Sequence, residues 1–348
     1  MSNVRRDAPR QPSMADVAAR AGVAIGTVSN TLNRPDKVRE PTRQRVLAAI
    51  AELGFVRNDA ARSLAAGTSH AVGLVLADMS NSFFVDIARG AEAVMRESDM
   101  DVLIVNSDVD PDRELHNLTL LERTRVAGVL LAPLDTPLAR AELLPTRAMP
   151  TVLVNYESPT GAVSGVVVNE RHGGALTVDH LVGLGRRRLL FAGGPLFLTA
   201  VRERRDGALS AAASYPDVTM TTRETSGLTV AHGRELGREL AASAPGTFDG
   251  IVAASDLLAI GIMQSLRDVP GFSVPDDIAI TGYDDNHFAS EGDIPVTTVS
   301  QHGEAMGRAA AELLLRHISD PHTRPSTIVL EPDLIPRRST LGADWHAE

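Results

Sequence analysis

The sequence SMADVAARAGVAIGTVSNTLN, residues 13–33, decides how the N-terminal part of the chain folds. Ser13 and Asp16 have the spacing of a helix N-terminus at which a hydroxyl and a carboxylate exchange hydrogen bonds with the backbone. The predicted helix ends at Gly22, which turns the chain without a Cβ clash. A second helix is predicted over residues 25–32, so the pattern indicates a helix-turn-helix.

A third helix is predicted from Pro41, a favoured first helical residue, to Gly54. In a helix-turn-helix the second helix enters the major groove of DNA, where its early side chains contact base edges. The candidates for DNA contact are Ile25, Gly26, Thr27, Ser29 and Asn30. Asn30 suits a base edge, most naturally adenine, or a phosphate, whereas the two hydroxyls suit phosphates or sugars. The alternative is a small helical bundle with a polar outer face.

The charge of the chain is divided unevenly along its length. Its 348 residues include 34 Lys and Arg against 44 Asp and Glu, a formal net charge of −10 that by itself argues against a nucleic-acid partner. Residues 1–70 hold eleven basic and six acidic residues and carry +5, which leaves −15 for the other 278 residues. We therefore expect a basic module attached to an acidic body.

Composition and motifs exclude several classes of protein. Hydrophobic residues make up 43% and no apolar run approaches the ~18 residues of a membrane span, so a globular protein without membrane segments is expected. The lack of cysteine excludes disulfides and suits the cytoplasm, and the first twelve residues do not form a signal peptide. The sequence has no GxGxxG after a strand and no GxxxxGK, GxSxG or HExxH, which argues against the alternative of a doubly wound nucleotide-dependent enzyme. We expect no catalytic residue, no metal and no other cofactor.

Residues 58–67, NDAARSLAAG, form a predicted linker. Asn58 can cap a helix and Gly67 can end one, but an isolated helix needs ~12–15 residues, so this helix requires support. Leu64 is a large apolar residue in this segment of small and polar residues. It is a candidate either for a wedge between base steps in the minor groove or for packing on the neighbouring domain.

From residue 71 onward, short β-rich runs alternate with amphipathic helical runs. This rhythm predicts an α/β fold with parallel sheets flanked by helices, and the strands are too numerous for one compact sheet. We therefore expect two lobes with a ligand cleft at the carboxyl ends of the strands. Strands are predicted at residues 72–76, 102–105, 129–131, 151–154, 189–192, 251–253 and 278–281.

Candidate ligand contacts follow two of these strands. Asn81, Phe83 and Phe84 follow the first strand, where an amide beside two rings suits the polar edge and flat face of a sugar or a base. One of the two rings is expected to belong to the core. Asp108 follows the second strand and is a further candidate.

Residues 14–69 resemble the DNA-binding headpiece and hinge of the LacI/GalR family of transcription regulators. The resemblance is carried by ADVAARAGV at residues 15–23, TVSN at 27–30, LN at 32–33 and RSLAAG at 62–67. It implies that Asn33, Asn58 and Ala65 join the DNA contacts, and that Leu64 is the wedge where the hinge helices of a dimer pair in the minor groove. The family usually has serine where this chain has Ala24, so one helix cap and one DNA contact are expected to be missing.

The resemblance also implies an architecture: a small all-α helix-turn-helix domain followed by a two-lobed core like that of periplasmic sugar-binding proteins. The expected parts are a disordered arm (1–12), a headpiece (13–57), a hinge (58–70) and a core (71–348). The first lobe is expected to hold about 71–168 and 299–327, and the second about 169–298 and 328–348. The last strand of the first lobe is expected near Val299, followed by a helix over residues 303–318.

An effector site between the lobes follows from the same resemblance. Arg204, Asp284 and Gln301 match ligand-binding positions of the family, and the aspartate of that position can accept two sugar hydroxyls. A sugar or sugar derivative is therefore the favoured effector.

Three departures leave the effector open. Asn155 stands where the family usually has aspartate, Tyr156 where sugar receptors often have arginine, and Ser255 where many members have asparagine. A nucleobase, a sugar phosphate and no effector at all remain as alternatives.

The expected function is repression of transcription by a homodimer that binds a double-stranded, pseudo-palindromic operator. Dimerisation is expected because one small headpiece makes too few contacts for specificity against genomic competition. Effector binding is expected to change the angle between the lobes and with it the affinity for the operator. A transport receptor is a third alternative, but it requires a signal peptide and no headpiece.

Overall fold

The computed structural model describes residues 12–55, 69–134, 149–242 and 246–346. The chain forms two compact units that divide between residues 68 and 69, and each is described by itself. Within the described residues no helix is both long enough and apolar enough to cross a membrane.

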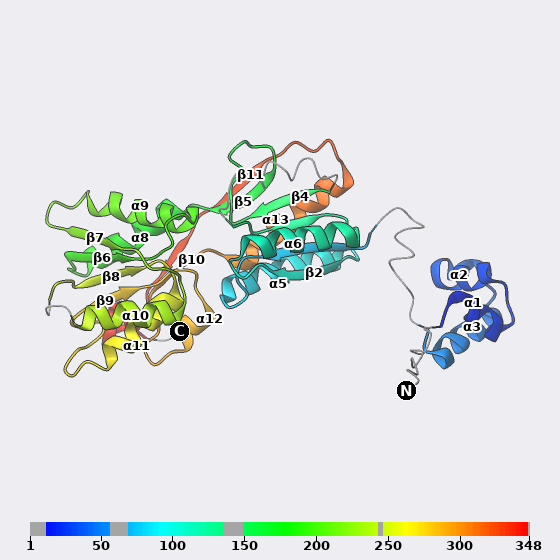
Figure 1. The fold of residues 1–348 in the computed structure, drawn as a ribbon, viewed down its shortest axis with the longest axis horizontal. Helices are drawn as coiled ribbons and strands as arrows, with labels where there is room; N and C mark the ends of the chain where they lie inside the picture. Colours follow the sequence, from blue (N-terminus) through cyan, green and yellow to red (C-terminus); the bar gives the residue numbers. More distant parts are fainter. Residues whose placement is uncertain (1–11, 56–68, 135–148, 243–245, 347–348) are drawn as a thin grey trace, which may run out of the picture. The chain divides into compact units, whose positions relative to one another are not determined.

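The N-terminal unit is a bundle of three helices, α1 (Met14–Ala21), α2 (Ile25–Asn33) and α3 (Glu40–Leu53) (Figure 1). A short 3-10 helix, η1 (Pro35–Lys37), connects the last two. The bundle core consists of small and branched side chains, among them Val17, Ala18, Val28, Val46 and Ala49. The three helices predicted from the sequence are therefore confirmed, with α3 beginning one residue before Pro41.

Both ends of α1 follow the sequence pattern. The Ser13 hydroxyl accepts a hydrogen bond from the Asp16 N–H, and the Asp16 carboxylate accepts one from the Ser13 N–H at 2.7 Å. Gly22 has φ +64° and its N–H donates to carbonyls of the last turn. These bonds satisfy backbone groups that a helix end otherwise leaves unpaired, and they set the entry and exit directions of the chain.

The second unit holds two parallel sheets, one in each lobe (Figure 1). The first sheet has the order β11-β5-β4-β3-β1-β2 and the second has the order β7-β6-β8-β9. The strands of the first sheet are β1 (Ala71–Leu76), β2 (Asp101–Asn106), β3 (Val129–Leu131), β4 (Thr151–Val154), β5 (Ser164–Val168) and β11 (Thr327–Leu330). Those of the second sheet are β6 (Arg188–Ala192), β7 (Thr219–Arg223), β8 (Gly250–Ala253) and β9 (Ala279–Thr281).

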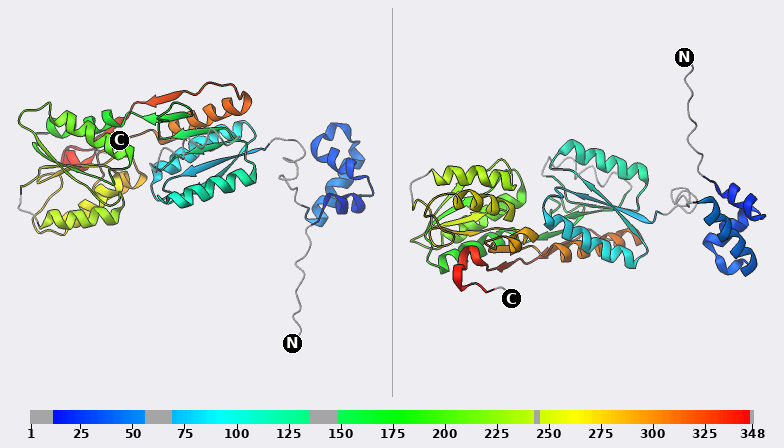
Figure 2. Two further views of the ribbon diagram at one scale, coloured as in Figure 1. Left: turned by 45° about the horizontal axis from the view of Figure 1, so that its top comes forward. Right: turned by 90° about the horizontal axis from the view of Figure 1, so that it is seen from below.

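Helices cover both faces of each sheet, as two further views show (Figure 2). The first sheet packs on α5 (Ser82–Glu97) and α13 (Gly303–Ser319) on one face and on α6 (Pro111–Thr124) on the other. The second packs on α8 (Glu170–Gly183) and α9 (Thr199–Ala212) on one face and on α10 (Val230–Ala241) and α11 (Asp256–Arg267) on the other. Because both faces are covered, the central strands are apolar throughout, as in β8, where all four residues are buried.

The helix pair α5 and α13 crosses closely because each helix has a glycine at the contact. A Cβ on Gly90 would collide with the backbone of Glu304, and one on Gly307 would collide with the backbone of Ile87. This approach brings the start of α13, just after Gln301, against the start of α5. The cavity described below is built partly from these two helix starts.

The sequence prediction for the last strand of the first lobe is wrong. Val299 belongs to β10 (Thr298–Ser300), which pairs antiparallel with β12 (Asp333–Ile335) in a separate two-stranded sheet. The sixth strand of the first sheet is β11, which runs parallel to β5. Val299 does not join the first sheet because its segment starts in the second lobe, where Thr297 bridges to Thr281 of β9. Residues 298–300 then carry the chain from one lobe to the other (Figure 1).

The remaining helices lie after β9 and at the end of the described chain. α12 (His287–Glu291) follows β9, and α14 (Arg338–Leu341) and the 3-10 helix η2 (Gly342–Asp344) follow β12. The segment after β11 runs from the first lobe to the second and is drawn in red (Figures 1 and 2).

Candidate functional site

Six sequence-predicted DNA contacts lie on helix α2. Ile25, Gly26 and Asn30 are exposed and Thr27 and Ser29 are half-buried, whereas the intervening Val28 is buried in the bundle core. Asn33 at the end of the helix is also exposed, and its Nδ2 donates to Ser29 Oγ at 3.2 Å. The helix therefore presents hydroxyl and amide groups on its outer side. Asn58, Leu64 and Ala65 lie outside the described residues.

The start of α2 has no side-chain cap. Ala24 occupies the N-cap with φ −70° and ψ 151°, and only its carbonyl, which accepts from the Thr27 N–H at 2.9 Å, contributes to the first turn. Serine in this backbone conformation supplies a side-chain acceptor to the first-turn N–H groups. The expected loss of one cap is confirmed.

A cavity of about 310 Å³ lies within the second unit, between its two lobes. Eight of the ten predicted effector residues line it. They are Asn81, Phe83, Phe84, Asn155 and Tyr156 from the first lobe, Arg204 and Asp284 from the second, and Gln301 after β10.

The first-lobe side of the cavity is built where strands end and helices begin. Asn81 is the N-cap of α5, and its side chain accepts a hydrogen bond from the Phe83 N–H at 3.0 Å. Phe83 is buried in the core of the lobe, as expected for one of the two rings, whereas Phe84 is half-buried. Their ring centroids are 5.2 Å apart, so the two aromatic side chains form one apolar wall.

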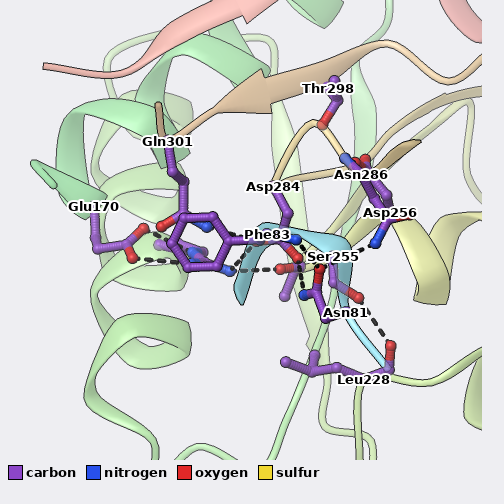
Figure 3. A network of polar contacts seen from close by, with 12 residues as sticks. Asn81, Phe83, Glu170, Leu228, Ser255, Asp256, Asp284, Asn286, Thr298 and Gln301 are labelled. Carbon is purple, nitrogen blue, oxygen red and sulfur yellow. Dashed lines mark hydrogen bonds and ion pairs between the residues drawn. The ribbon is translucent and has the colours of Figure 1, made fainter. Parts of the chain in front are cut away.

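Asp284 is the centre of the polar side of the cavity (Figure 3). Its Oδ2 accepts a hydrogen bond from Asn81 Nδ2 at 2.7 Å, and its Oδ1 accepts one from Gln301 Nε2 at 2.6 Å. The residue has φ +107° and bridges to Ser300, which fixes it beside the crossover strand. Gln301 Oε1 is buried and has no hydrogen-bond partner among the described residues.

Glu170, at the start of α8, binds the guanidinium of Arg204. Nε and Nη2 of Arg204 donate to the two carboxylate oxygens of Glu170 at 2.7 and 2.8 Å. Nη1 donates to the Ala254 carbonyl at 2.8 Å and lies 3.5 Å from Asp284 Oδ1. The guanidinium also lies over the ring of Tyr283, 3.8 Å from its centroid.

The pKa values of this cluster are displaced by burial and by neighbouring charges. Burial raises the pKa of Asp284 to about 6, although Arg204 and the hydrogen bond from Asn81 act in the opposite direction. Burial opposes the charge of Arg204, but the carboxylate of Glu170 outweighs it and raises the pKa of Arg204 further. Arg204 is therefore a permanent cation, whereas Asp284 changes its charge close to neutral pH.

Two predicted effector residues do not line the cavity. Asp108 is exposed and forms an ion pair with Arg113 at 2.5 Å, and its neighbour Val109 lines the cavity instead. Ser255 is buried as the N-cap of α11, where its hydroxyl accepts from the Leu258 N–H and donates to the Leu228 carbonyl at 2.9 Å. Its hydroxyl is therefore bonded to the backbone both as donor and as acceptor.

Several residues of the site were not predicted from the sequence. Glu170 follows β5, a strand that the sequence pattern did not indicate, so the rule that ligand contacts follow strands was not applied there. Apolar residues at the starts of α9 and α11 and one histidine also line the cavity: Leu198, Val201, Leu257 and His232. His232 Nδ1 and Thr229 Oγ1 are 2.8 Å apart.

Two protein-family models match the chain. Residues 13–58 match bacterial regulatory proteins of the lacI family, and residues 178–340 match the periplasmic binding protein-like domain. The ribose operon repressor of Bacillus subtilis is 33% identical over 94% of this chain and 98% of its own length. The transcriptional regulator CelR of Thermobifida fusca is 34% identical over 95% of this chain and 98% of its own length.

Solved structures show the same fold. The complex of transcriptional regulator CelR with cellobiose has a TM-score of 0.69 at 31% identity and covers 94% of this chain and 99% of that chain. The Lac repressor bound to ONPG has a TM-score of 0.82 at 24% identity, over 95% of this chain and 100% of that chain. The chain belongs to the LacI family of bacterial transcriptional regulators.

Proposed function

We propose that the chain represses transcription as a homodimer on a pseudo-palindromic operator, with α2 of each protomer in a major groove. The polar outer side of α2, with Thr27, Ser29, Asn30 and Asn33, supports this proposal. The net charge of +5 over residues 1–70 favours contact with phosphates in a chain that is otherwise acidic. In this proposal residues 13–57 are the headpiece and 58–70 the hinge, with Leu64 as a minor-groove wedge.

The proposed effector is a sugar or sugar derivative in the cavity between the lobes. The observation that carries this proposal is the position of Asp284, whose carboxylate lies at the cavity wall between Asn81 and Gln301. A carboxylate with amide neighbours binds vicinal hydroxyls, and the aromatic wall of Phe83 and Phe84 suits the apolar face of a sugar ring. Two relatives are a ribose operon repressor and a regulator solved with cellobiose, which agrees with this ligand class.

The proposed coupling between effector and operator follows from the position of the cavity. A ligand there contacts both lobes, so its binding favours one arrangement of the lobes over others. By linkage the same free energy, on the order of 1–3 kcal/mol in allosteric proteins, changes the affinity for DNA.

The test is to select operator sequences from random DNA with the full chain and then to measure operator affinity with candidate ligands. We expect a two-fold symmetric selected sequence and a change in affinity with ribose, cellobiose or a related neutral sugar. A response to adenine alone indicates a nucleobase effector. Selection of no preferred sequence contradicts the proposed role of α2.

A further inference from the structure

Arg204 has almost no capacity left for a ligand. A free guanidinium has five N–H donors in a planar fork that matches phosphate or carboxylate. Here the fork formed by Nε and Nη2 is already closed on Glu170, and Nη1 donates to the Ala254 carbonyl. One face of the group is covered by the ring of Tyr283. The two parallel N–H donors that could bind an anion in a bidentate manner are therefore already bonded to Glu170.

The charges of the residues that line the cavity also argue against an anionic ligand. Among the described lining residues Arg204 is the only arginine or lysine, and the acidic lining residues are Asp78 and Asp284. Glu170 lies directly behind Arg204, and the side chains of both are almost fully buried, with 9% and 5% exposed. Little solvent separates the pair, so Glu170 cancels most of the attraction that Arg204 exerts on an incoming anion.

The buried lining atom that lacks a hydrogen-bond partner among the described residues is an acceptor. Gln301 Oε1 is buried at the wall without a partner among the described residues, and Asp284 offers further carboxylate lone pairs. An acceptor in this position gains a hydrogen bond from an O–H or N–H group, either of water or of a ligand.

We infer that Glu170 is a specificity-determining residue that restricts the cavity to uncharged, hydrogen-bond-donating effectors and excludes phosphorylated and carboxylated ones. This inference rests on the proposed function, because it assigns a ligand class to the same cavity. Glu170 acts through Arg204: it positions the guanidinium and compensates its positive charge. Neutral effectors then bind through the acceptors of Asp284 and Gln301.

The first arm of the test uses the full-length wild-type chain and calorimetric titration with ribose and ribose 5-phosphate. We expect the phosphate ester to bind at least about tenfold more weakly than the parent sugar. It brings negative charge to a wall where Asp78 and Asp284 are acidic and where Arg204 is already paired with Glu170. Equal or tighter binding of the phosphate ester overturns the inference.

The second arm uses inorganic phosphate and does not depend on which sugar binds. The Glu170→Gln variant keeps the side-chain shape but removes the carboxylate that closes on Arg204, which leaves Asp284, 3.5 Å from Nη1, as its remaining acidic contact. Phosphate is therefore expected to raise the thermal midpoint of the variant by several degrees relative to chloride at equal ionic strength. The wild type is expected to show no such difference. Glu203→Gln is the matched control, because Glu203 precedes Arg204 on α9 but pairs with the exposed Arg171. A second control, Glu170→Gln with Arg204→Gln, is expected to lose the phosphate effect.

The two arms separate this inference from the proposed function. If no neutral sugar binds but phosphate stabilises only Glu170→Gln, the sugar proposal fails and the role of Glu170 stands. If ribose binds and phosphate stabilises the wild type as much as the variant, the role of Glu170 is overturned and the sugar proposal stands. Should Glu170→Gln fail to fold, the ratio of ribose to ribose 5-phosphate affinity in the wild type decides the inference alone.

Discussion

Asn81 and Asp284 are 203 residues apart in the sequence, yet Asn81 Nδ2 donates a hydrogen bond to Asp284 Oδ2 at 2.7 Å. This bond joins the start of α5 in the first lobe to the loop after β9 in the second. Asn286 Nδ2 donates back to Asn81 Oδ1 at 3.0 Å, and the His287 N–H donates to Ser82 Oγ at 2.9 Å. A ligand that contacts Asp284 therefore contacts the same groups that hold the lobes together.

Asn81→Asp is expected to destabilise the second unit at neutral pH. The introduced carboxylate still accepts from the Phe83 N–H, but it replaces a donor to Asp284 with a second negative charge. We expect the free energy of unfolding to fall by about 1–3 kcal/mol, as for other losses of a partner by a buried charged group. Urea denaturation at about pH 7 measures the change.

The stability deficit of Asn81→Asp is expected to depend on pH, and this dependence is a control for the assigned contact. The pKa of Asp284 is about 6, so at about pH 5 its protonated form can donate to the introduced carboxylate. The deficit relative to the wild type is expected to shrink there. A deficit that is equal at both pH values contradicts the assigned contact between these two residues.

Effector affinity is expected to decrease as the pH falls through about 6. The ionised carboxylate of Asp284 accepts hydroxyl hydrogen bonds, and protonation removes acceptor capacity and requires a proton to be released on binding. Calorimetric titrations from about pH 5 to about pH 8 measure this dependence, which Asp284→Asn is expected to abolish. A pH-independent affinity in the wild type contradicts the role of Asp284 as the acceptor.

Protonation of Asp284 is also expected to change the stability of the second unit, in the opposite direction to its effect on effector affinity. The pKa of Asp284 in the folded protein, about 6, lies above the ordinary value of 3.8, so the folded state binds the proton more tightly than the unfolded state. The stabilisation from Asp284 is therefore complete below about pH 4 and is lost as the pH rises to about 6. Affinity and stability consequently respond to pH in opposite directions.

Ala24→Ser is expected to stabilise the headpiece. Ala24 already has the extended conformation of an N-cap, and a serine hydroxyl there can accept from the first-turn N–H groups of α2. We expect a gain of about 1 kcal/mol in the unfolding free energy of the N-terminal unit. Hydrogen exchange of α2 amides in the full chain measures it, with Ala19→Ser on α1 as a control that offers no cap. Equal effects of the two substitutions contradict the assignment.

Asn30→Ala is expected to relax base preference at one position of each operator half-site. Asn30 is exposed on α2, and a paired contact to a base edge is typically worth about 1–3 kcal/mol of discrimination. Binding to a panel of operators with single base changes measures the effect, and Ser29→Ala is expected to weaken all of them alike. A uniform loss for Asn30→Ala assigns the residue to a phosphate instead.

Much of the N-terminal unit could be predicted from local sequence, because its signals are local. The bond between Ser13 and Asp16 spans three residues, and glycine is the favoured residue where φ is positive, as at Gly22. The apolar strands β1, β3, β4, β6, β8 and β9 were also apparent as short branched runs. In contrast, β7 (TMTTR) and β11 (TIVL) lie at sheet edges, where residue exposure alternates along the strand, and neither was predicted. The interior strand β5 (SGVVV) was not predicted either.

Asn81 was identified because it follows a predicted strand, whereas Asp284 and Gln301 were identified through the resemblance to the family. Neither signal predicted that the three side chains meet, because the contacts form through the packing of three distant segments. Ser255 was assigned to the ligand through the resemblance to the family, but its hydroxyl caps α11 instead. Glu170 was missed because its function depends on Arg204, 34 residues further along the chain.

The most direct test of the account is the affinity of the full chain for a selected operator, measured by fluorescence anisotropy with and without a neutral sugar. For the wild type we predict a ligand-dependent change of about 5–150-fold, the range of typical allosteric coupling. For Asp284→Ala we predict that specific operator binding is retained and that the ligand does not change its affinity. A wild type that binds the sugar but keeps its operator affinity, or a variant that responds fully, contradicts the claim that this cavity controls DNA binding.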